Sequence, residues 1–261
     1  MASGEAASPG PALSGRCAVV TGAAAGIGRA IVQRLIEHGA SVHGLDRDAS
    51  AQRQLACAWG ERYQAHVVDL ADRAACDRAL LELQLRLAGR CDILINNAGI
   101  SRLQPFASSD DAVIDSQFAI NVVAAFRITR SLLPALRASG RGVIVNMASE
   151  LALVGAAGYS VYCATKGALL AWSRALAVEL AAEGIRVNAV CPGPIDTALL
   201  QQEFASYRDP NAARAAEVAT VPLGRLGTPS DIAAVVAFLA SDAAAFATGA
   251  AWTVDGGKTA R

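Results

Sequence analysis

The chain has 261 residues, of which 53% are hydrophobic, and its 23 lysine and arginine residues balance 23 aspartate and glutamate residues. This composition excludes an intrinsically disordered chain, because disorder needs low hydrophobicity and high net charge. It also argues against a nucleic-acid binder, because no basic excess is present to neutralise phosphates. The length is sufficient for one large α/β domain or two small ones.

Residues 1–13 are small, polar and proline-containing, without a basic start or a long apolar segment. They predict a flexible tail rather than a signal peptide. We expect no membrane span, because no run of about 18 uncharged apolar residues occurs. The six cysteines form no Cys-x-x-Cys pair, which favours reduced thiols in a cytoplasmic protein over a disulfide framework or a zinc site.

Short apolar runs alternate with helix-like segments along the chain from residue 16 to 251. The helix-like segments have apolar residues at a helical spacing and predict helices at 27–37, 111–138 and 159–182, with a further helix opening at Thr228. The predicted strands are 17–20, 41–45, 65–68, 92–95, 142–147, 185–190 and 250–254.

The predicted strands are almost entirely apolar and do not alternate between apolar and polar residues. Such strands are buried on both faces, as in a parallel sheet covered by helices. We therefore predict an α/β fold with one domain, residues 14–261, built as a doubly wound parallel sheet with helices on both faces. Residues 197–220 interrupt the alternation as a long irregular section, and we expect this segment to cover a substrate.

A glycine-rich segment, TGAAAGIG at residues 21–28, follows the first predicted strand and opens the first predicted helix. Gly22 allows a tight turn, Gly26 allows a pyrophosphate to approach the backbone, and Gly28 allows the helix to pack near the strand. The helix N-terminus then presents N–H groups to the phosphates. The segment predicts a dinucleotide site, whereas three glycines alone would also suit a flexible turn.

Asp46 ends the second predicted strand about 20 residues after the glycine-rich segment. A carboxylate at this place accepts hydrogen bonds from both ribose hydroxyls and repels a 2′-phosphate, which favours NAD over NADP. Arg47 is next in the chain and could accommodate a 2′-phosphate, but no basic residue lies among residues 23–25 as a second anchor. We predict NAD as the cofactor; alternatively, Asp46 is a solvated turn residue.

Tyr162 and Lys166 are four positions apart on a predicted helix and therefore share a face. A phenol with an ordinary pKa of about 10 must be perturbed to exchange protons near neutrality, and a nearby ammonium favours the phenolate. The alternative is an exposed tyrosine and lysine on an ordinary amphipathic helix. Ser149 ends the fifth predicted strand, where open α/β sheets bind ligands, so its hydroxyl can donate to a substrate oxygen or, alternatively, cap a loop.

Five motifs in chain order resemble those of the short-chain dehydrogenase/reductase (SDR) family: Thr-Gly-x3-Gly-Ile-Gly at 21–28, Asn-Asn-Ala-Gly at 96–99, Tyr-x3-Lys at 162–166, Pro-Gly at 192–193 and Asp-Gly-Gly at 255–257. The resemblance covers residues 13–257. It implies a Rossmann-type fold, a nicotinamide cofactor, a small-molecule alcohol or ketone substrate and association as a homotetramer or dimer. Nucleic acid, membrane and metal are not among the expected partners.

The resemblance assigns cofactor contacts to residues at the carboxyl ends of the predicted strands. Asp69 and Leu70 resemble the pair that contacts the adenine, although Asp69 could instead cap the following helix. Thr197 and a nearby main-chain N–H are expected to bind the carboxamide. The full set expected to bind the cofactor is Thr21, Gly22, Gly26, Ile27, Gly28, Asp46, Asp69, Leu70, Asn96, Ala98, Gly99, Tyr162, Lys166, Pro192, Gly193, Ile195 and Thr197.

The resemblance also assigns the catalytic roles. Ser149 polarises the substrate, Tyr162 transfers the proton, and Lys166 binds the nicotinamide ribose and lowers the pKa of Tyr162. Asn121 lies amid apolar residues in a predicted helix and therefore needs a hydrogen-bond partner. It is expected to help hold a water that links Lys166 to solvent, or it could simply tie two helices together.

We therefore expect an NAD(H)-dependent oxidoreductase that interconverts a secondary alcohol and a ketone by hydride transfer, with Tyr162 as general acid and base. An NADPH-dependent 3-oxoacyl-carrier-protein reductase is an alternative, against which Asp46 and the lack of a basic patch argue. A non-catalytic dinucleotide-binding protein is another, against which the intact catalytic set argues. Near the substrate, Arg102 could anchor an acidic group and Glu150 a hydroxyl-rich substrate, or both could be solvated loop charges.

Overall fold

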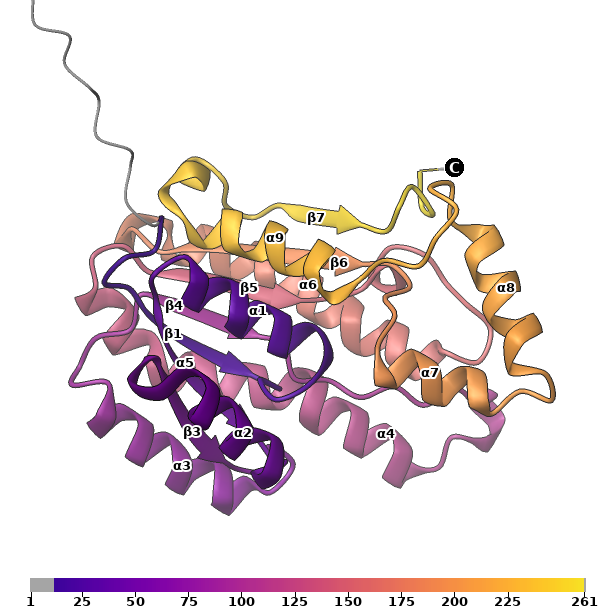
Figure 1. The fold of residues 1–261 in the computed structure, drawn as a ribbon, viewed down its shortest axis with the longest axis horizontal. Helices are drawn as coiled ribbons and strands as arrows, with labels where there is room; N and C mark the ends of the chain where they lie inside the picture. Colours follow the sequence, from indigo (N-terminus) through magenta and orange to yellow (C-terminus); the bar gives the residue numbers. More distant parts are fainter. Residues whose placement is uncertain (1–11, 261) are drawn as a thin grey trace, which may run out of the picture.

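The computed structural model describes residues 12–260 and contains one seven-stranded sheet in which every pair of neighbouring strands is parallel (Figure 1). The spatial order of the strands is β3-β2-β1-β4-β5-β6-β7. Their bounds are Cys17–Thr21 (β1), Ser41–Asp46 (β2), Tyr63–Val67 (β3), Ile93–Asn96 (β4), Val143–Met147 (β5), Arg186–Pro192 (β6) and Ala251–Val254 (β7). The predicted doubly wound parallel sheet is confirmed.

The direction in which the chain adds strands reverses between β1 and β4. The chain first builds β1, β2 and β3 toward one edge and then returns to place β4 on the other side of β1, with Val19 opposite Leu94. Because all strands are parallel, their carboxyl ends lie at one edge, and the loops after β1 and β4 diverge there. Open α/β sheets bind their ligands in the crevice at this reversal.

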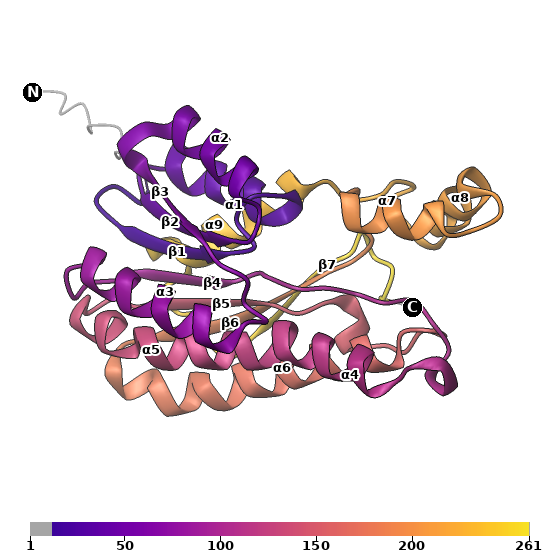
Figure 2. The same ribbon diagram turned by 90° about the horizontal axis from the view of Figure 1, so that it is seen from below.

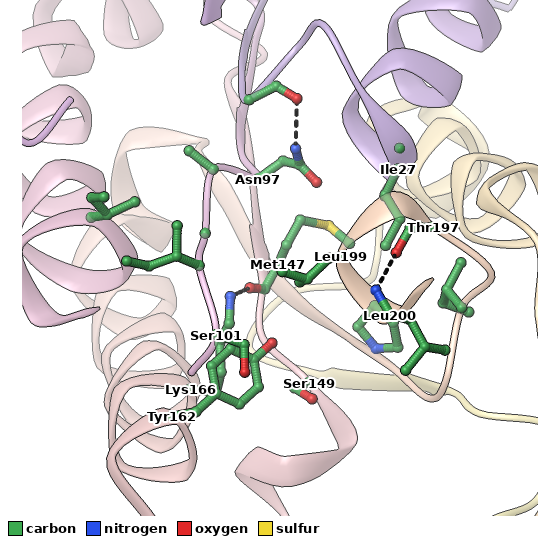
Figure 3. A pocket seen from close by; sticks show the side chains of 18 of the residues that line it. Ile27, Asn97, Ser101, Met147, Ser149, Tyr162, Lys166, Thr197, Leu199 and Leu200 are labelled. Atoms are coloured by element: carbon green, nitrogen blue, oxygen red, sulfur yellow. Dashed lines mark hydrogen bonds between the residues drawn. The ribbon is translucent and has the colours of Figure 1, made fainter. Parts of the chain in front are cut away.

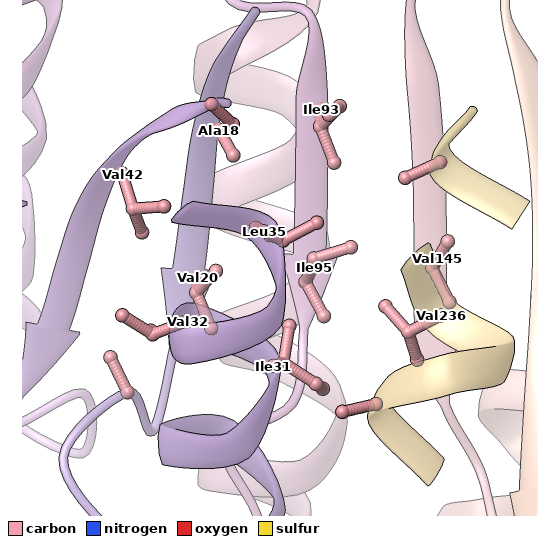
Figure 4. Close-up of a cluster of buried hydrophobic side chains, with 14 of the residues drawn as sticks. Ala18, Val20, Ile31, Val32, Leu35, Val42, Ile93, Ile95, Val145 and Val236 are labelled. Carbon is pink, nitrogen blue, oxygen red and sulfur yellow. The ribbon is translucent and has the colours of Figure 1, made fainter. Parts of the chain in front are cut away.

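Helices cover both faces of the sheet (Figure 2). One face carries α1 (Gly26–Glu37), α2 (Ala49–Trp59) and α9 (Pro229–Ala240), and the other carries α3 (Arg73–Arg86), α5 (Ala124–Ala138) and α6 (Ser160–Leu180). In β1, Val20 packs in the apolar cluster under α1 and α9 (Figure 4), whereas Val19 packs in the cluster on the opposite face. Two covered faces explain why the strands are apolar throughout.

The helix predicted at 111–138 is continuous but changes its pitch near the middle. Helix α4 (Asp111–Phe118) leads into a π-helical turn (Ala119–Val123) and then into α5. By length and composition alone, this 28-residue segment is the one described helix apolar enough to cross a membrane. Half of its most apolar part is buried inside the protein, against α6 and the sheet, as in the core helices of globular proteins.

The segment 197–220, predicted to be irregular, instead forms two helices, α7 (Ala198–Ala205) and α8 (Pro210–Thr220). Each begins with a side-chain cap, because Thr197 accepts a backbone N–H of α7 and Asp209 accepts two from α8. Both helices extend beyond the carboxyl edge of the sheet (Figure 2), where the segment was expected to lie.

Two further differences from the predicted elements have local causes. Helices α2 and α3 lie outside the predicted set because few of their residues are apolar and buried; α3, for example, buries only Cys76, Leu80 and Leu83. Strand β3 begins at Tyr63 rather than at residue 65, because Tyr63 is itself buried and pairs with Val42 of β2.

The packed part of the domain begins at a lower residue number than predicted. Most of the predicted flexible tail, residues 1–13, lies outside the described residues. Leu13, however, is fully buried, and its N–H donates to the carbonyl of His38 at 2.9 Å. Arg16 is also buried and forms an ion pair with Asp242. The packed chain therefore begins before residue 14.

Two histidines lie side by side in the sheet, His43 on β2 and His66 on β3. Their ring nitrogens Nδ1 and Nε2 are 3.1 Å apart, and both side chains are buried. Burial lowers the pKa of His43 to about 4, with a further contribution from the neighbouring His66, and burial also lowers the pKa of His66. Both rings are therefore neutral at pH 7.

We predict that this pair makes the fold sensitive to acid. A histidine in the unfolded chain has a pKa of about 6.5, so below that pH the unfolded chain binds protons that the folded chain takes up only near pH 4. The resulting loss of unfolding free energy should be roughly 1–2 kcal/mol between pH 7 and pH 5. Urea denaturation at both pH values should show a smaller loss for His43→Asn; the same loss in wild type and variant would contradict the prediction.

Candidate functional site

A cavity of about 510 Å³ lies at the carboxyl edge of the sheet. Loops after β1 to β6 form most of its wall, and α7, α8 and the C-terminal segment close its far end. Most of the predicted site residues line it: Gly22, Gly26, Ile27, Asp46, Asp69, Leu70, Ala98, Gly99, Ser149, Tyr162, Lys166, Pro192, Gly193, Ile195 and Thr197. Thr21, Gly28, Asn96 and Asn121 lie behind this wall.

The glycine turn brings backbone to the cavity where side chains would obstruct it. Gly22 has a φ of +62° and Gly26 a φ of +50°, in the left-handed region that favours glycine. A Cβ on Gly22 would lie 3.0 Å from Cα of Ala98, and one on Gly28 would lie 1.9 Å from the Gly22 carbonyl oxygen. Gly28 therefore supports the turn from behind and does not reach the cavity.

The N-terminus of α1 is suited to an anion. Ala25 at its N-cap makes no side-chain cap, and the first turn contains no acidic residue, so the described residues leave its N–H groups unclaimed by side chains. These N–H groups and the helix dipole favour a phosphate-sized anion. The observed turn thus fits the pyrophosphate of a dinucleotide.

The side chains of Thr21 and Asn96, two residues predicted to contact the cofactor, form hydrogen bonds with other parts of the protein. The Thr21 hydroxyl accepts the N–H groups of Asn97 and Ala98, each at 3.0 Å. The Asn96 amide is buried and donates to Oδ1 of Asn146 at 2.7 Å, across the β4–β5 pair. These two side chains stabilise the loops that form the cavity but do not line the cavity themselves.

Asn97 is a structural residue of the site that lies outside the predicted set. Its side-chain amide donates to the carbonyl oxygens of Thr21 at 2.9 Å and Gly22 at 3.1 Å, which clasps the glycine turn to the loop after β4 (Figure 3). The signal in the sequence is the second asparagine of Asn96-Asn97, directly after a buried strand.

Two acidic residues line the part of the cavity beside the glycine turn. Asp46 Oδ2 accepts the Ala24 N–H at 3.0 Å, and its Oδ1 accepts the Asp48 N–H at the same distance, so the carboxylate is held in one orientation. Asp69 lines the cavity from the loop after β3. The alternative that Asp69 caps the next helix does not hold, because Asp72 caps α3.

Ser149, Tyr162 and Lys166 meet at the middle of the cavity (Figure 3). The Ser149 hydroxyl oxygen accepts the Leu151 N–H at 3.1 Å, which leaves the hydroxyl proton available for a substrate oxygen. The Lys166 ammonium is buried, donates to the Met147 carbonyl oxygen at 2.8 Å and lies 5.6 Å from the centre of the Tyr162 ring. A serine hydroxyl, a phenol and an ammonium around one open space can stabilise an oxygen and exchange its proton.

The protonation of these groups departs from expectation. Burial raises the pKa of Tyr162 to about 12, while the Ser149 hydrogen bond lowers it. Burial lowers the pKa of Lys166 to about 8. The expected lowering of the Tyr162 pKa by Lys166 is not seen in this structure, because the ammonium lies over the ring and desolvation of the phenol dominates.

Asn121 lies in the π-helical turn between α4 and α5. Its Oδ1 accepts the Ile100 N–H at 2.8 Å, and its Nδ2 donates to the Ile100 carbonyl at 2.9 Å and to the Thr165 hydroxyl at 3.0 Å. The side chain thus ties this helix to the loop after β4 and to α6, which is the structural alternative considered for it. Its Oδ1 and the Lys166 ammonium both flank Gly99, within 3.4 Å of where a Cβ would stand.

The far end of the cavity contains charged residues that sequence spacing alone does not bring together. Lys258 Nζ donates to Oε1 of Glu150 at 2.8 Å and to Oε1 of Glu217 at 2.6 Å, although Glu150 is 108 positions away in the chain. Tyr159 donates its hydroxyl to Glu203 of α7. Glu150 is therefore not a solvated loop charge, whereas Arg102 is exposed and lies outside the described cavity wall.

Comparison with known proteins agrees with this architecture. A family model described as enoyl-(acyl carrier protein) reductase matches residues 22–259. The chain is 38% identical over 255 residues to 2-(S)-hydroxypropyl-CoM dehydrogenase 3 of Xanthobacter autotrophicus, covering 95% of this chain and 98% of that protein. It is 36% identical over 252 residues to sorbitol dehydrogenase of Cereibacter sphaeroides, covering 94% and 98%.

A third relative, the 3-oxoacyl-[acyl-carrier-protein] reductase FabG of Salmonella typhimurium, is 35% identical over 245 residues, with 94% of this chain and 98% of that protein covered. The relatives are named as dehydrogenases or reductases of alcohols and ketones, and the matches extend over almost the whole fold. The chain therefore belongs to the short-chain dehydrogenase/reductase family of oxidoreductases.

Proposed function

We propose that this protein uses NAD(H) to interconvert a secondary alcohol and a ketone, with Tyr162 as the group that exchanges the hydroxyl proton. The observation that carries the proposal is the meeting of Ser149, Tyr162 and Lys166 in one cavity, between the uncapped N-terminus of α1 and the helices α7 and α8. The names of the relatives, which include alcohol dehydrogenases and ketone reductases, support the same reaction class.

The proposed roles follow from where each polar group lies. The Ser149 hydroxyl donates to the substrate oxygen, and the Tyr162 hydroxyl, which lines the same cavity, gives or takes the proton of that oxygen. A pKa of about 12 keeps Tyr162 protonated at pH 7, which suits it as the acid in ketone reduction. A nicotinamide held by residues such as Lys166 and Thr197 would supply the hydride acceptor or donor, and its oxidised ring would favour the phenolate through its positive charge.

Asp46 supports NAD as the preferred cofactor. Its carboxylate is held by two backbone N–H groups at the cavity edge, so its negative charge stays where a 2′-phosphate would have to lie. Arg47 also lines the cavity and is the observation that favours the alternative, an NADPH-dependent reductase of carrier-bound 3-oxoacyl groups like one of the relatives.

We also propose that the protein self-associates through α5 and α6. Phe126 of α5 packs against Trp172 of α6 with ring centroids 4.3 Å apart and ring planes tilted by 41°, and Phe126 remains 39% exposed. Val178, further along α6, is 82% exposed. Apolar groups on two adjacent helices favour burial against a second copy. The tetramer itself and the cytoplasmic location stay predictions.

Replacing Tyr162 tests the proton-transfer role. Tyr162→Phe removes only the hydroxyl, so it should lower kcat for oxidation of a secondary alcohol by about 10²–10⁴-fold while leaving the Kd for NADH, measured by fluorescence, within about threefold. Tyr207→Phe, at an exposed tyrosine at the end of α7, is the matched control and should retain wild-type kcat. Near-normal turnover by Tyr162→Phe would refute the assignment.

Replacing Asp46 tests the cofactor preference. Asp46→Ala removes the charge that repels a 2′-phosphate, so the ratio of kcat/KM with NAD to that with NADP should fall by about tenfold or more. Asp48→Asn removes a neighbouring exposed carboxylate but keeps an N-cap for α2, and it should retain the wild-type ratio. A wild-type enzyme equally efficient with both cofactors would overturn the preference for NAD.

A further inference from the structure

The far end of the cavity carries hydrogen-bonding groups of both kinds. Glu150 comes from the loop after β5, Glu203 from α7 and Glu217 from α8, and all three carboxylates line the same space. Lys258 donates to Glu150 and Glu217, and the Tyr159 hydroxyl donates to Glu203. This end of the cavity thus alternates acceptors and donors instead of presenting a uniform apolar wall.

Glu150 is the member of this group that lacks a full set of partners. It is only 5% exposed, and Lys258 occupies its Oε1. Its second oxygen, Oε2, is buried and has no hydrogen-bond partner among the described residues. A buried carboxylate oxygen without a donor is unfavourable, so this atom calls for a donor that a ligand can bring.

The position of Glu150 relates it to the reacting centre. It directly follows Ser149 in the chain, and its negative charge acts on Tyr162, where it raises the pKa of the phenol. Because Glu150 lines the same cavity as Ser149 and Tyr162, a substrate whose carbinol oxygen contacts these two residues can extend its neighbouring carbon toward Glu150. A hydroxyl on that neighbouring carbon could donate the hydrogen bond that Oε2 of Glu150 lacks.

The charges argue against other substrates. Three carboxylates face one ammonium at this end, and Lys258 already binds two of them, so the charge at this end disfavours an anionic group on the substrate. A cationic substrate would compete with Lys258 for the same carboxylates. An uncharged hydroxyl can donate to Glu150 and accept from Lys258 at once.

We propose that Glu150 is a specificity-determining residue and that the substrate is an uncharged vicinal diol or the matching α-hydroxyketone, whose second hydroxyl donates to Glu150. The inference rests on the proposed function and names the substrate class for that site. Lys258 positions the Glu150 carboxylate, since it binds both Glu150 and Glu217 and so connects the loop after Ser149 with α8.

The test compares 2-butanol with two substrates that each differ from it by one group, 2,3-butanediol (an added hydroxyl) and 3-hydroxybutyrate (a carboxylate in place of a methyl), each with NAD and read as NADH formation. For the wild-type protein, kcat/KM should be at least about tenfold higher for 2,3-butanediol than for either of the others. Glu150→Gln should reduce the ratio of 2,3-butanediol to 2-butanol by about tenfold. Glu61→Gln, at an exposed glutamate far from the cavity, should keep the wild-type ratio.

A double variant sharpens the charge argument. Glu150→Gln with Glu217→Gln leaves Lys258 without its two carboxylates, so it should raise kcat/KM for 3-hydroxybutyrate relative to 2-butanol by about tenfold. Unchanged NADH binding, followed by fluorescence, shows that each variant is folded.

The outcomes separate this inference from the proposed function. A wild-type enzyme that oxidises 2-butanol or 3-hydroxybutyrate as well as 2,3-butanediol overturns the inference and leaves the proposed function intact. A preference for the diol that survives Glu150→Gln overturns the role of Glu150. Absence of turnover with any substrate and either cofactor overturns the proposed function, and this inference with it.

Discussion

The close contact between the glycine turn after β1 and the loop after β4 is the constraint on which the rest of the site depends. At this contact a Cβ on Gly22 would lie 3.0 Å from the backbone of Ala98, and the Asn97 amide holds the turn by two carbonyl oxygens. The contact can exist only because the strand order reverses between β1 and β4 and the two loops leave the same edge in opposite directions. It aligns the N-terminus of α1 with the cavity and sets Gly99, Lys166 and Asn121 on its other side.

Burial then determines the chemistry of the centre. Lys166 is buried and lies over the Tyr162 ring. Desolvation raises the pKa of the Tyr162 phenol and lowers the pKa of the Lys166 ammonium, so it favours the neutral form of both groups. Of the groups around the phenol, the Ser149 hydroxyl favours the phenolate, whereas Glu150 and Glu203 oppose it. The reactive phenol therefore responds to the carboxylates at the far end of the cavity.

Much of this arrangement follows from local sequence. The apolar strands, the glycine turn at Gly22 and the position of Asp46 are local patterns, and each stands where it was expected. Side-chain direction is different, because Thr21 and Asn96 sit beside the site in sequence and yet turn into the scaffold. The pairing of Lys258 with Glu150 joins residues 108 positions apart, and no spacing rule could have found it. Helices α7 and α8 were not predicted because their sequences lack a clear apolar stripe at helical spacing. What marks their starts is instead the capping side chains of Thr197 and Asp209.

The central claim is that this cavity transfers a hydride between a carbinol carbon and a nicotinamide while Tyr162 handles the proton. Isotope transfer tests it most directly. The protein is incubated with NAD and a secondary alcohol that carries deuterium on the carbinol carbon, and the cofactor is analysed by mass spectrometry. The account predicts reduced cofactor that contains one deuterium and an oxidation that is slower than with the unlabelled alcohol. Reduced cofactor without deuterium, or no reduced cofactor across a panel of labelled alcohols, would contradict it.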